Sequence, residues 1–228
     1  MIVDTGPVAI RHFRVVCTSA DAATAHIVLR AVLLASGPGV TTLTTEVAGV
    51  THEATHSVAA GENQVEWTIT VPDPELWWPT GNGDQPLFDV NVTARTEDGD
   101  VSDRKHRRIG FRTTELHDFI LRVNNRRTFL RGVNLSVLRQ NLACMSPEEI
   151  RAEVAAIRDA GFNFVRVRGH VTRHEFIDAA DELGILIWQD LPLFGPYDRS
   201  VTAAACLLYT SDAGRRSTLC RSRWSPYH

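Results

Sequence analysis

Cysteine is scarce in this sequence, and long hydrophobic runs are missing. The four cysteines, at positions 17, 144, 206 and 220, form no CxxC pair and have no histidine at metal-ligand spacing, which favours isolated thiols over a metal centre. No apolar run approaches the roughly 20 residues of a membrane helix, and the opening residues lack a signal-peptide pattern. We therefore expect no membrane partner. The compartment, cytoplasmic or secreted, stays open, because the opening stretch resembles the interior of a longer protein.

An excess of charge of one sign is also missing. The 24 Lys and Arg residues face 27 Asp and Glu, a net charge of −3, so nothing indicates nucleic acid as a partner. No GxGxxG follows an apolar run, which argues against dinucleotide binding. We expect no cofactor, neither metal nor nucleotide. The 43% apolar content suffices for one large or two ordinary domains with packed cores.

Short apolar runs alternate with turn signals through the first half of the chain. In Gln64–Val71 every second residue is apolar, which predicts a strand with one buried and one solvated face. About seven such strands within roughly 110 residues predict an immunoglobulin-like β-sandwich. The expected strands are Val8–Cys17, Ala25–Ala35, Val40–Val47, His52–Ala59, Gln64–Val71, Phe88–Thr96 and Val101–Phe111.

Two stretches of this region have an unusual composition. Leu76–Phe88 holds the pair Trp77 and Trp78 beside Pro79. Such a pair fits a carbohydrate-stacking platform or, as we favour, a turn packed against a neighbouring domain or strand edge. Arg104–Arg108, RKHRR, is a basic run that we assign to a solvated edge strand rather than to an anion site.

The second half changes to an alternation of strands and helices. Two expected strands, Phe119–Val123 and Thr128–Leu130, flank Asn124–Arg127, which predicts a hairpin turn. Ser146 and Pro147 begin a helix, and Gly161 and Gly184 end this helix and the next. Strands joined by one such helix lie parallel, with their C-terminal ends at one edge of the sheet. The expected order is strand 130–135, helix 147–160, strand 163–168, helix 172–183 and strand 185–190.

This order begins either a doubly wound sheet or an α/β barrel, and the missing dinucleotide fingerprint favours the barrel. A (β/α)8 TIM barrel needs eight such units and about 250 residues, so we expect only its first three units. The predicted domains are the sandwich at 1–112 and a truncated barrel at 113–205. The expected strand ends carry Arg166, Arg168, His170 and Asp190, at the edge where parallel α/β folds bind ligands.

The last 23 residues, 206–228, differ in character from the rest. Cys206 to Ala213 can be back-translated as TGTCTCTTATACACATCTGACGCT, which resembles a transposon-end adapter of short-read sequencing libraries. Arg221 to His228 can be written AGATCTCGGTGGTCGCCGTATCAT, which resembles the flow-cell primer that follows this adapter. We interpret 206–228 as adapter read-through and exclude it from fold reasoning; the alternative is a genuine basic tail.

Several motifs occur in the order of a known family: LWWPTGNGDQPLFDVNV, IGFRTTEL, RTFLRGVNLS, AGFNFVRVRG and ADELGILIWQDLP. Together they resemble glycoside hydrolase family 2, and LWWP with WQD resembles its β-mannosidase-like branch. The resemblance implies an immunoglobulin-like domain before a catalytic (β/α)8 barrel. It also implies a carbohydrate substrate and a retaining hydrolase that removes terminal β-linked sugars.

The resemblance places the two catalytic glutamates beyond the third barrel strand. One follows an Asn at the end of the fourth strand, and the other ends the seventh. Retaining glycosidases need two carboxyl groups about 5 Å apart, and we find no such pair in this sequence. We therefore expect no catalytic residue here and an inactive fragment.

The resemblance assigns roles to three residues of the expected strand ends. Arg166 matches an arginine that hydrogen-bonds the nucleophile carboxylate, although a structural ion pair with Asp190 is the alternative. Asp190 matches the acid that ends the third strand, either accepting from a sugar hydroxyl or pairing with Arg166. Asn134 matches the asparagine of RGxN, which supports the pocket floor.

Two positions depart from the β-mannosidase pattern RVWGGG. Arg168 replaces its Trp, and His170 replaces a Gly. A cationic and a hydrogen-bonding side chain thus stand where an aromatic wall is expected, although a lone His is as often structural. The alternatives are a β-galactosidase- or β-glucuronidase-like member of the family, or a non-catalytic sugar-binding or scaffold protein.

Overall fold

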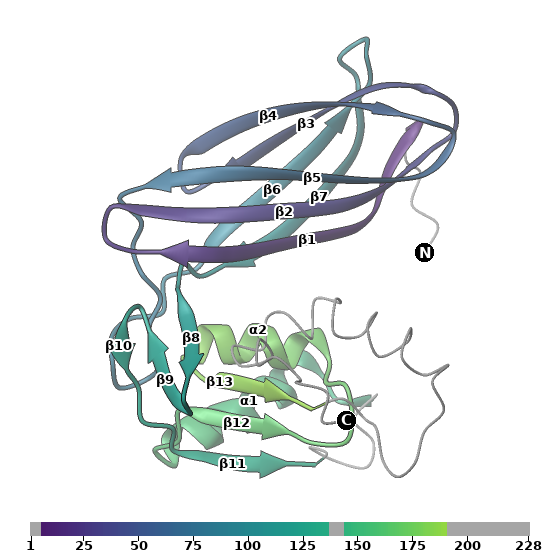
Figure 1. Cartoon of the computed structure of the whole chain (residues 1–228). Helices are drawn as coiled ribbons and strands as arrows, with labels where there is room; N and C mark the ends of the chain where they lie inside the picture. Colours follow the sequence, from purple (N-terminus) through teal and green to yellow (C-terminus); the bar gives the residue numbers. More distant parts are fainter. Residues whose placement is uncertain (1–5, 137–143, 191–228) are drawn as a thin grey trace, which may run out of the picture. The chain divides into compact units, whose positions relative to one another are not determined.

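A computed structural model describes residues 6–136 and 144–190 (Figure 1). The described chain forms two compact units. The first holds residues up to Glu75 together with Leu87–Phe111, and the second holds Leu76–Pro86 together with the described residues from Arg112 onward. The predictions for 191–205 and 206–228 lie outside the described residues.

The first unit is a β-sandwich of two antiparallel sheets, and its seven strands are the seven predicted ones. The sheet order is β1-β2-β5 in one sheet and β4-β3-β6-β7 in the other. This is an immunoglobulin-like arrangement in which the fourth strand belongs to the sheet of the third. The strands are β1 (Val8–Ala20), β2 (Thr24–Ala35), β3 (Gly39–Val47), β4 (Val50–Val58), β5 (Gly61–Pro72), β6 (Phe88–Arg95) and β7 (Val101–Ile109).

The sandwich core follows the alternation of the sequence. In β5, Trp67, Ile69 and Val71 are buried, whereas the residues between them are exposed. The Trp67 indole N–H donates to Thr45 Oγ1 of β3 at 3.1 Å, and the Thr45 side chain is fully buried. Because this hydrogen bond joins the two sheets, the one polar atom of the Trp67 ring is satisfied inside the core.

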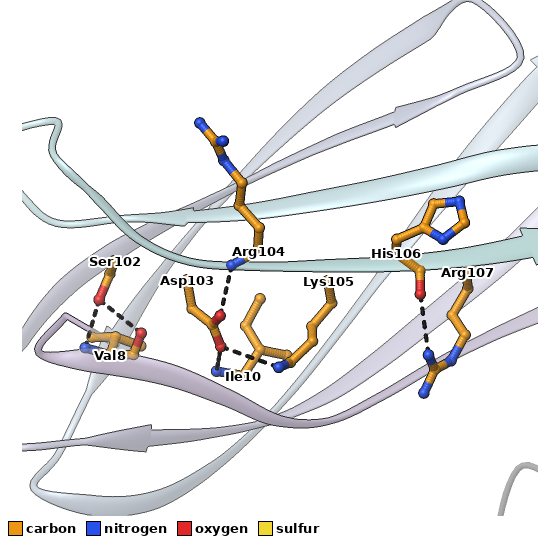
Figure 2. Close-up of polar contacts among 8 residues, drawn as sticks. All are labelled: Val8, Ile10, Ser102, Asp103, Arg104, Lys105, His106 and Arg107. Atoms are coloured by element: carbon orange, nitrogen blue, oxygen red, sulfur yellow. Dashed lines mark hydrogen bonds and ion pairs between the residues drawn. The ribbon is translucent and has the colours of Figure 1, made fainter. Parts of the chain in front are cut away.

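Side chains of the edge strand β7 bind the backbone of β1, which begins the other sheet (Figure 2). Ser102 Oγ accepts from the Val8 N–H at 2.8 Å and donates to the Val8 carbonyl at 2.7 Å. Asp103 Oδ2 accepts from the Ile10 N–H at 2.7 Å. These side chains supply hydrogen bonds that a neighbouring strand would otherwise make. The basic run Arg104–Arg108 lies on this edge strand, as predicted.

We predict that Ser102→Ala destabilises the first unit. The change leaves the Val8 N–H and carbonyl without their buried partner, which costs about 1–3 kcal/mol. Urea unfolding followed by circular dichroism measures the loss. Ser57→Ala on the exposed face of β4 is the matched control, and equal midpoints for the two variants would contradict the role given to Ser102.

The second unit begins with a small antiparallel sheet, ordered β10-β9-β8. Its strands are β8 (Thr114–His117), β9 (Ile120–Val123) and β10 (Arg126–Arg127). Asn124 and Asn125 have φ of 49° and 62°, as a two-residue hairpin turn requires. The predicted four-residue turn is thus too long, since the strand resumes at Arg126, and 128–130 is not a strand.

A parallel sheet with two helices completes the second unit, in the predicted order (Figure 1). The elements are β11 (Gly132–Leu135), α1 (Pro147–Asp159), β12 (Phe164–Val167), α2 (His174–Leu183) and β13 (Leu186–Gln189). Ser146 and Glu149 form a capping box at the start of α1, and Gly184 ends α2 with φ of 73°. Within the described ranges, neither helix is long and apolar enough to cross a membrane.

One face of the parallel sheet packs against the helices. Val165, Val167 and Ile187 are buried there with side chains of α1 and α2. Successive residues of a strand point to opposite faces. The residues between these buried ones, Arg166 and Trp188, therefore lie on the face turned away from the helices.

Candidate functional site

The register of the parallel sheet aligns three polar or aromatic residues. Asn134 of β11 pairs in register with Arg166 of β12, which pairs with Trp188 of β13. All three lie on the face turned away from the helices, near the C-terminal edge. Asn134 is exposed, and its side chain makes no hydrogen bond within residues 6–136 and 144–190. This row is where a parallel α/β sheet presents side chains to a ligand.

Arg166 and Asp190 form an ion pair across β12 and β13. The Arg166 Nε and Nη2 atoms lie 2.9 and 2.8 Å from Asp190 Oδ2. The Arg166 side chain is 45% exposed and that of Asp190 19%. Asp190 Oδ1 has no hydrogen-bond partner among the described residues. A carboxylate oriented by a guanidinium, with one oxygen free, can accept from a hydroxyl group of a ligand.

Arg168 and His170 lie in the segment that follows β12. The Arg168 N–H donates to the Leu135 carbonyl at 2.8 Å, which extends the β11–β12 pairing by one residue. Its guanidinium is exposed and has no ion-pair partner in the described part of the chain. His170 is half-buried, and its Nε2 is shielded from solvent with no hydrogen-bond partner among the described residues. The structure thus brings Arg166, Arg168, His170 and Asp190 to one edge of the sheet.

Gln189 is a polar residue beside this edge that was not predicted from the sequence. Its side chain is buried at a helix-facing position of β13, where apolar residues dominate. The amide Nε2 donates to the carbonyls of His170 and Asp190 at 2.6 and 2.8 Å. A glutamine at the last helix-facing position of a buried strand was the available signal, because buried amides need partners.

The Leu76–Pro86 segment, predicted as part of the sandwich domain, belongs to the second unit. Trp77 is fully buried, and its indole N–H donates to the Asp181 carbonyl in the last turn of α2 at 2.7 Å. The Arg112 guanidinium lies 4.1 Å from the Trp77 ring centroid and 2.9 Å from Asp181 Oδ1. The packed-turn interpretation is confirmed for Trp77, and a sugar platform built on this ring is wrong.

Trp77 and Arg112 thus cover the C-terminal end of α2, and backbone contacts extend this cap. The Thr80 N–H donates to the Gly184 carbonyl at 2.8 Å, and a Cβ on Gly184 would lie 2.6 Å from Thr80 N. Asn124 Nδ2 donates to the Trp77 carbonyl at 3.0 Å. The final carbonyls of a helix lack partners within it, so Trp77 and Thr80 supply them from a distant part of the sequence.

We predict that Trp77→Phe destabilises α2. The aromatic ring stays over Arg112, but the Asp181 carbonyl loses its donor in a buried site, which costs about 1–3 kcal/mol. Hydrogen exchange of peptides from α2 and β13 measures this loss. Phe119→Ala is the control because Phe119 is fully exposed; unchanged exchange in Trp77→Phe would show that this donor is dispensable.

Three comparisons with known proteins show what this chain is similar to. Residues 8–112 match the family model of glycosyl hydrolases family 2. A β-mannosidase of Capra hircus is 31% identical over 150 residues, covering 60% of this chain and 16% of the relative. A putative β-glucuronidase of Formosa agariphila is 35% identical over 124 residues, covering 54% of this chain and 15% of the relative.

A solved exo-chitosanase of Amycolatopsis orientalis superimposes with a TM-score of 0.70 at 27% identity, over 81% of this chain and 23% of that one. These matches define the class of protein that the chain resembles: it is similar to glycosyl hydrolases family 2 and, by that resemblance, to glycosidases. Among its curated relatives it is β-mannosidase-like. It spans less than a fifth of either curated relative.

Proposed function

We propose that this chain is the sandwich and the first three β/α units of the catalytic barrel of a retaining glycosidase that removes terminal β-mannosyl residues. The observation that carries the proposal is the Arg166–Asp190 pair at the C-terminal ends of adjacent parallel strands. In (β/α)8 barrels, catalytic and binding residues sit at this edge. The family match supports a sugar as the ligand.

Each residue of the edge has a role in this proposal. Asp190 accepts from a sugar hydroxyl through Oδ1, while Arg166 holds the carboxylate in place and leaves its remaining N–H groups for the nucleophile. Asn134, in register beside Arg166, supports the pocket floor. Arg168 and His170, in the segment that follows β12, contact the outer part of the sugar.

The chemistry needs a carboxyl pair about 5 Å apart, one acting as the nucleophile and one as the acid and then the base. The described ends of β11, β12 and β13 carry one carboxylate, Asp190. Asp190 is already paired with the Arg166 guanidinium through Oδ2, and no second carboxylate lies beside it at these described strand ends. We therefore propose that the 228-residue chain binds the sugar weakly and does not hydrolyse it.

The test is a titration of this chain with methyl β-mannopyranoside, followed by the NMR signal of the Arg166 Nε–H. We expect this signal to shift, and Asp190→Asn to abolish the shift because the amide no longer anchors the guanidinium. Arg11→Gln is the control, since it breaks an exposed ion pair of the sandwich with Glu62. An unmoved Arg166 signal at saturating sugar, or hydrolysis of p-nitrophenyl β-mannoside by the chain, would refute the proposal.

A second candidate is a glycosidase for acidic sugars, which one observation favours. The Arg168 guanidinium is exposed and unpaired in the described part of the chain, and guanidinium groups bind carboxylates in a forked geometry. The similarity to a putative β-glucuronidase points the same way.

Methyl β-glucuronide distinguishes the two candidates. If the acidic sugar is the ligand, it shifts the Arg168 Nε–H signal more than the mannoside does, the effect weakens with added salt, and Arg168→Gln removes it. Equal responses of wild type and Arg168→Gln to both sugars would eliminate this candidate and leave the mannoside.

A further inference from the structure

We propose that Gln189 is a positioning residue. Its buried amide holds the segment 168–173, which follows β12, in one conformation beside Asp190. This inference rests on the proposed function, because that segment carries Arg168 and His170. It assigns no contact between Gln189 and the sugar.

The hydrogen bonds between the strands end at Arg168 and Asp190, where this segment begins. The Asp190 N–H donates to the Val167 carbonyl at 2.9 Å, and the Arg168 N–H donates to the Leu135 carbonyl at 2.8 Å. Beyond Arg168 the backbone leaves β12 before α2 begins at His174. A connection of this kind needs other partners for its backbone groups if it is to keep one conformation.

The Gln189 side chain supplies those partners. Its Nε2 donates one hydrogen bond to the His170 carbonyl and one to the Asp190 carbonyl, with nitrogen–oxygen distances of 2.6 and 2.8 Å. Its Oε1 faces the Thr172 N–H at 3.5 Å. One side chain therefore links the backbone of the candidate sugar-contacting histidine to the backbone of the candidate sugar-contacting acid.

Burial makes this link costly to lose. Gln189 is 5% exposed and Thr172 also 5%. Water does not readily replace an amide in such a site, so the two carbonyls would remain unpaired. An apolar residue at position 189 would suit the core equally well, as Ile187 does. The glutamine is thus explained by the segment it holds.

The sharpest variant is Gln189→Glu, which preserves shape and exchanges the donating nitrogen for an oxygen. An ionised Glu places that oxygen against two carbonyl oxygens and repels them, whereas a protonated Glu donates one hydrogen bond again. Burial raises the pKa of such a carboxyl group, so the change is reversible by pH. The titratable neighbours, His170 and Asp190, are retained in all variants.

Hydrogen exchange of the intact 228-residue chain, corrected for the intrinsic pH dependence, is the measurement. In Gln189→Glu at pH 8 we expect the amides of 168–173 to exchange roughly tenfold to a hundredfold faster than in wild type, because two hydrogen bonds are lost. At pH 5 most of this difference disappears. Gln64→Glu, on the exposed face of β5, makes the same charge change without effect.

A second variant guards against misfolding. Gln189→Met fills the same space without polar atoms, and we expect fast exchange in 168–173 at both pH values and a shifted His170 ring signal, with α1 protected as in wild type. Wild-type exchange in this segment for both variants would overturn the proposal. The exchange measurement involves no sugar, so it tests the role of Gln189 separately from the proposed function. If the Gln189 variants lose protection in 168–173 but the Arg166 signal does not move in the sugar titration, only the proposed function is rejected.

Discussion

The hydrogen-bonded register of β11, β12 and β13 is the constraint on which the candidate site depends. Parallel pairing aligns Asn134, Arg166 and Trp188 in one row and brings Asp190 within 2.8 Å of Arg166. A shift of one residue in β12 would turn Arg166 into the helix-packed core and Val165 or Val167 out of it. Burial of those valines against α1 and α2 therefore determines where the guanidinium points. The chemistry of the edge follows from the packing on the opposite face.

The second support of the site lies at the other end of β13. Trp77, Thr80 and Arg112 cap the C-terminal turn of α2, and β13 begins directly after that turn. The capping segment comes from between two sandwich strands, so its sequence neighbours belong to the first unit. A chain divided at residue 112 would separate Trp77 from the helix that it caps. The tertiary fold thus ties the end of α2 to residues far from it in sequence.

Local patterns explain what the sequence predicted well. The sandwich strands alternate apolar and polar residues, and the helices have capping signals at Ser146 and Gly184, so both are visible from neighbouring residues alone. The short strand β8 was not predicted, because four residues with mixed polarity give no clear alternation. The assignment of Leu76–Pro86 to the second unit could not be predicted, for another reason. Its partners lie near residues 112, 124 and 181, and no local pattern connects them.

The sequence by itself determined the kind of each main element, the parallel order of the last three strands and the polar residues that end them. Periodicity and caps are short-range properties, and handedness rules then leave few ways to connect the elements. Only the tertiary structure decided that Trp77 is buried rather than exposed to a ligand, that Arg166 reaches Asp190, and that the Gln189 amide donates to the backbone carbonyls of His170 and Asp190. Burial and hydrogen-bond partners depend on residues distant in the chain, and these come together only when the chain is folded.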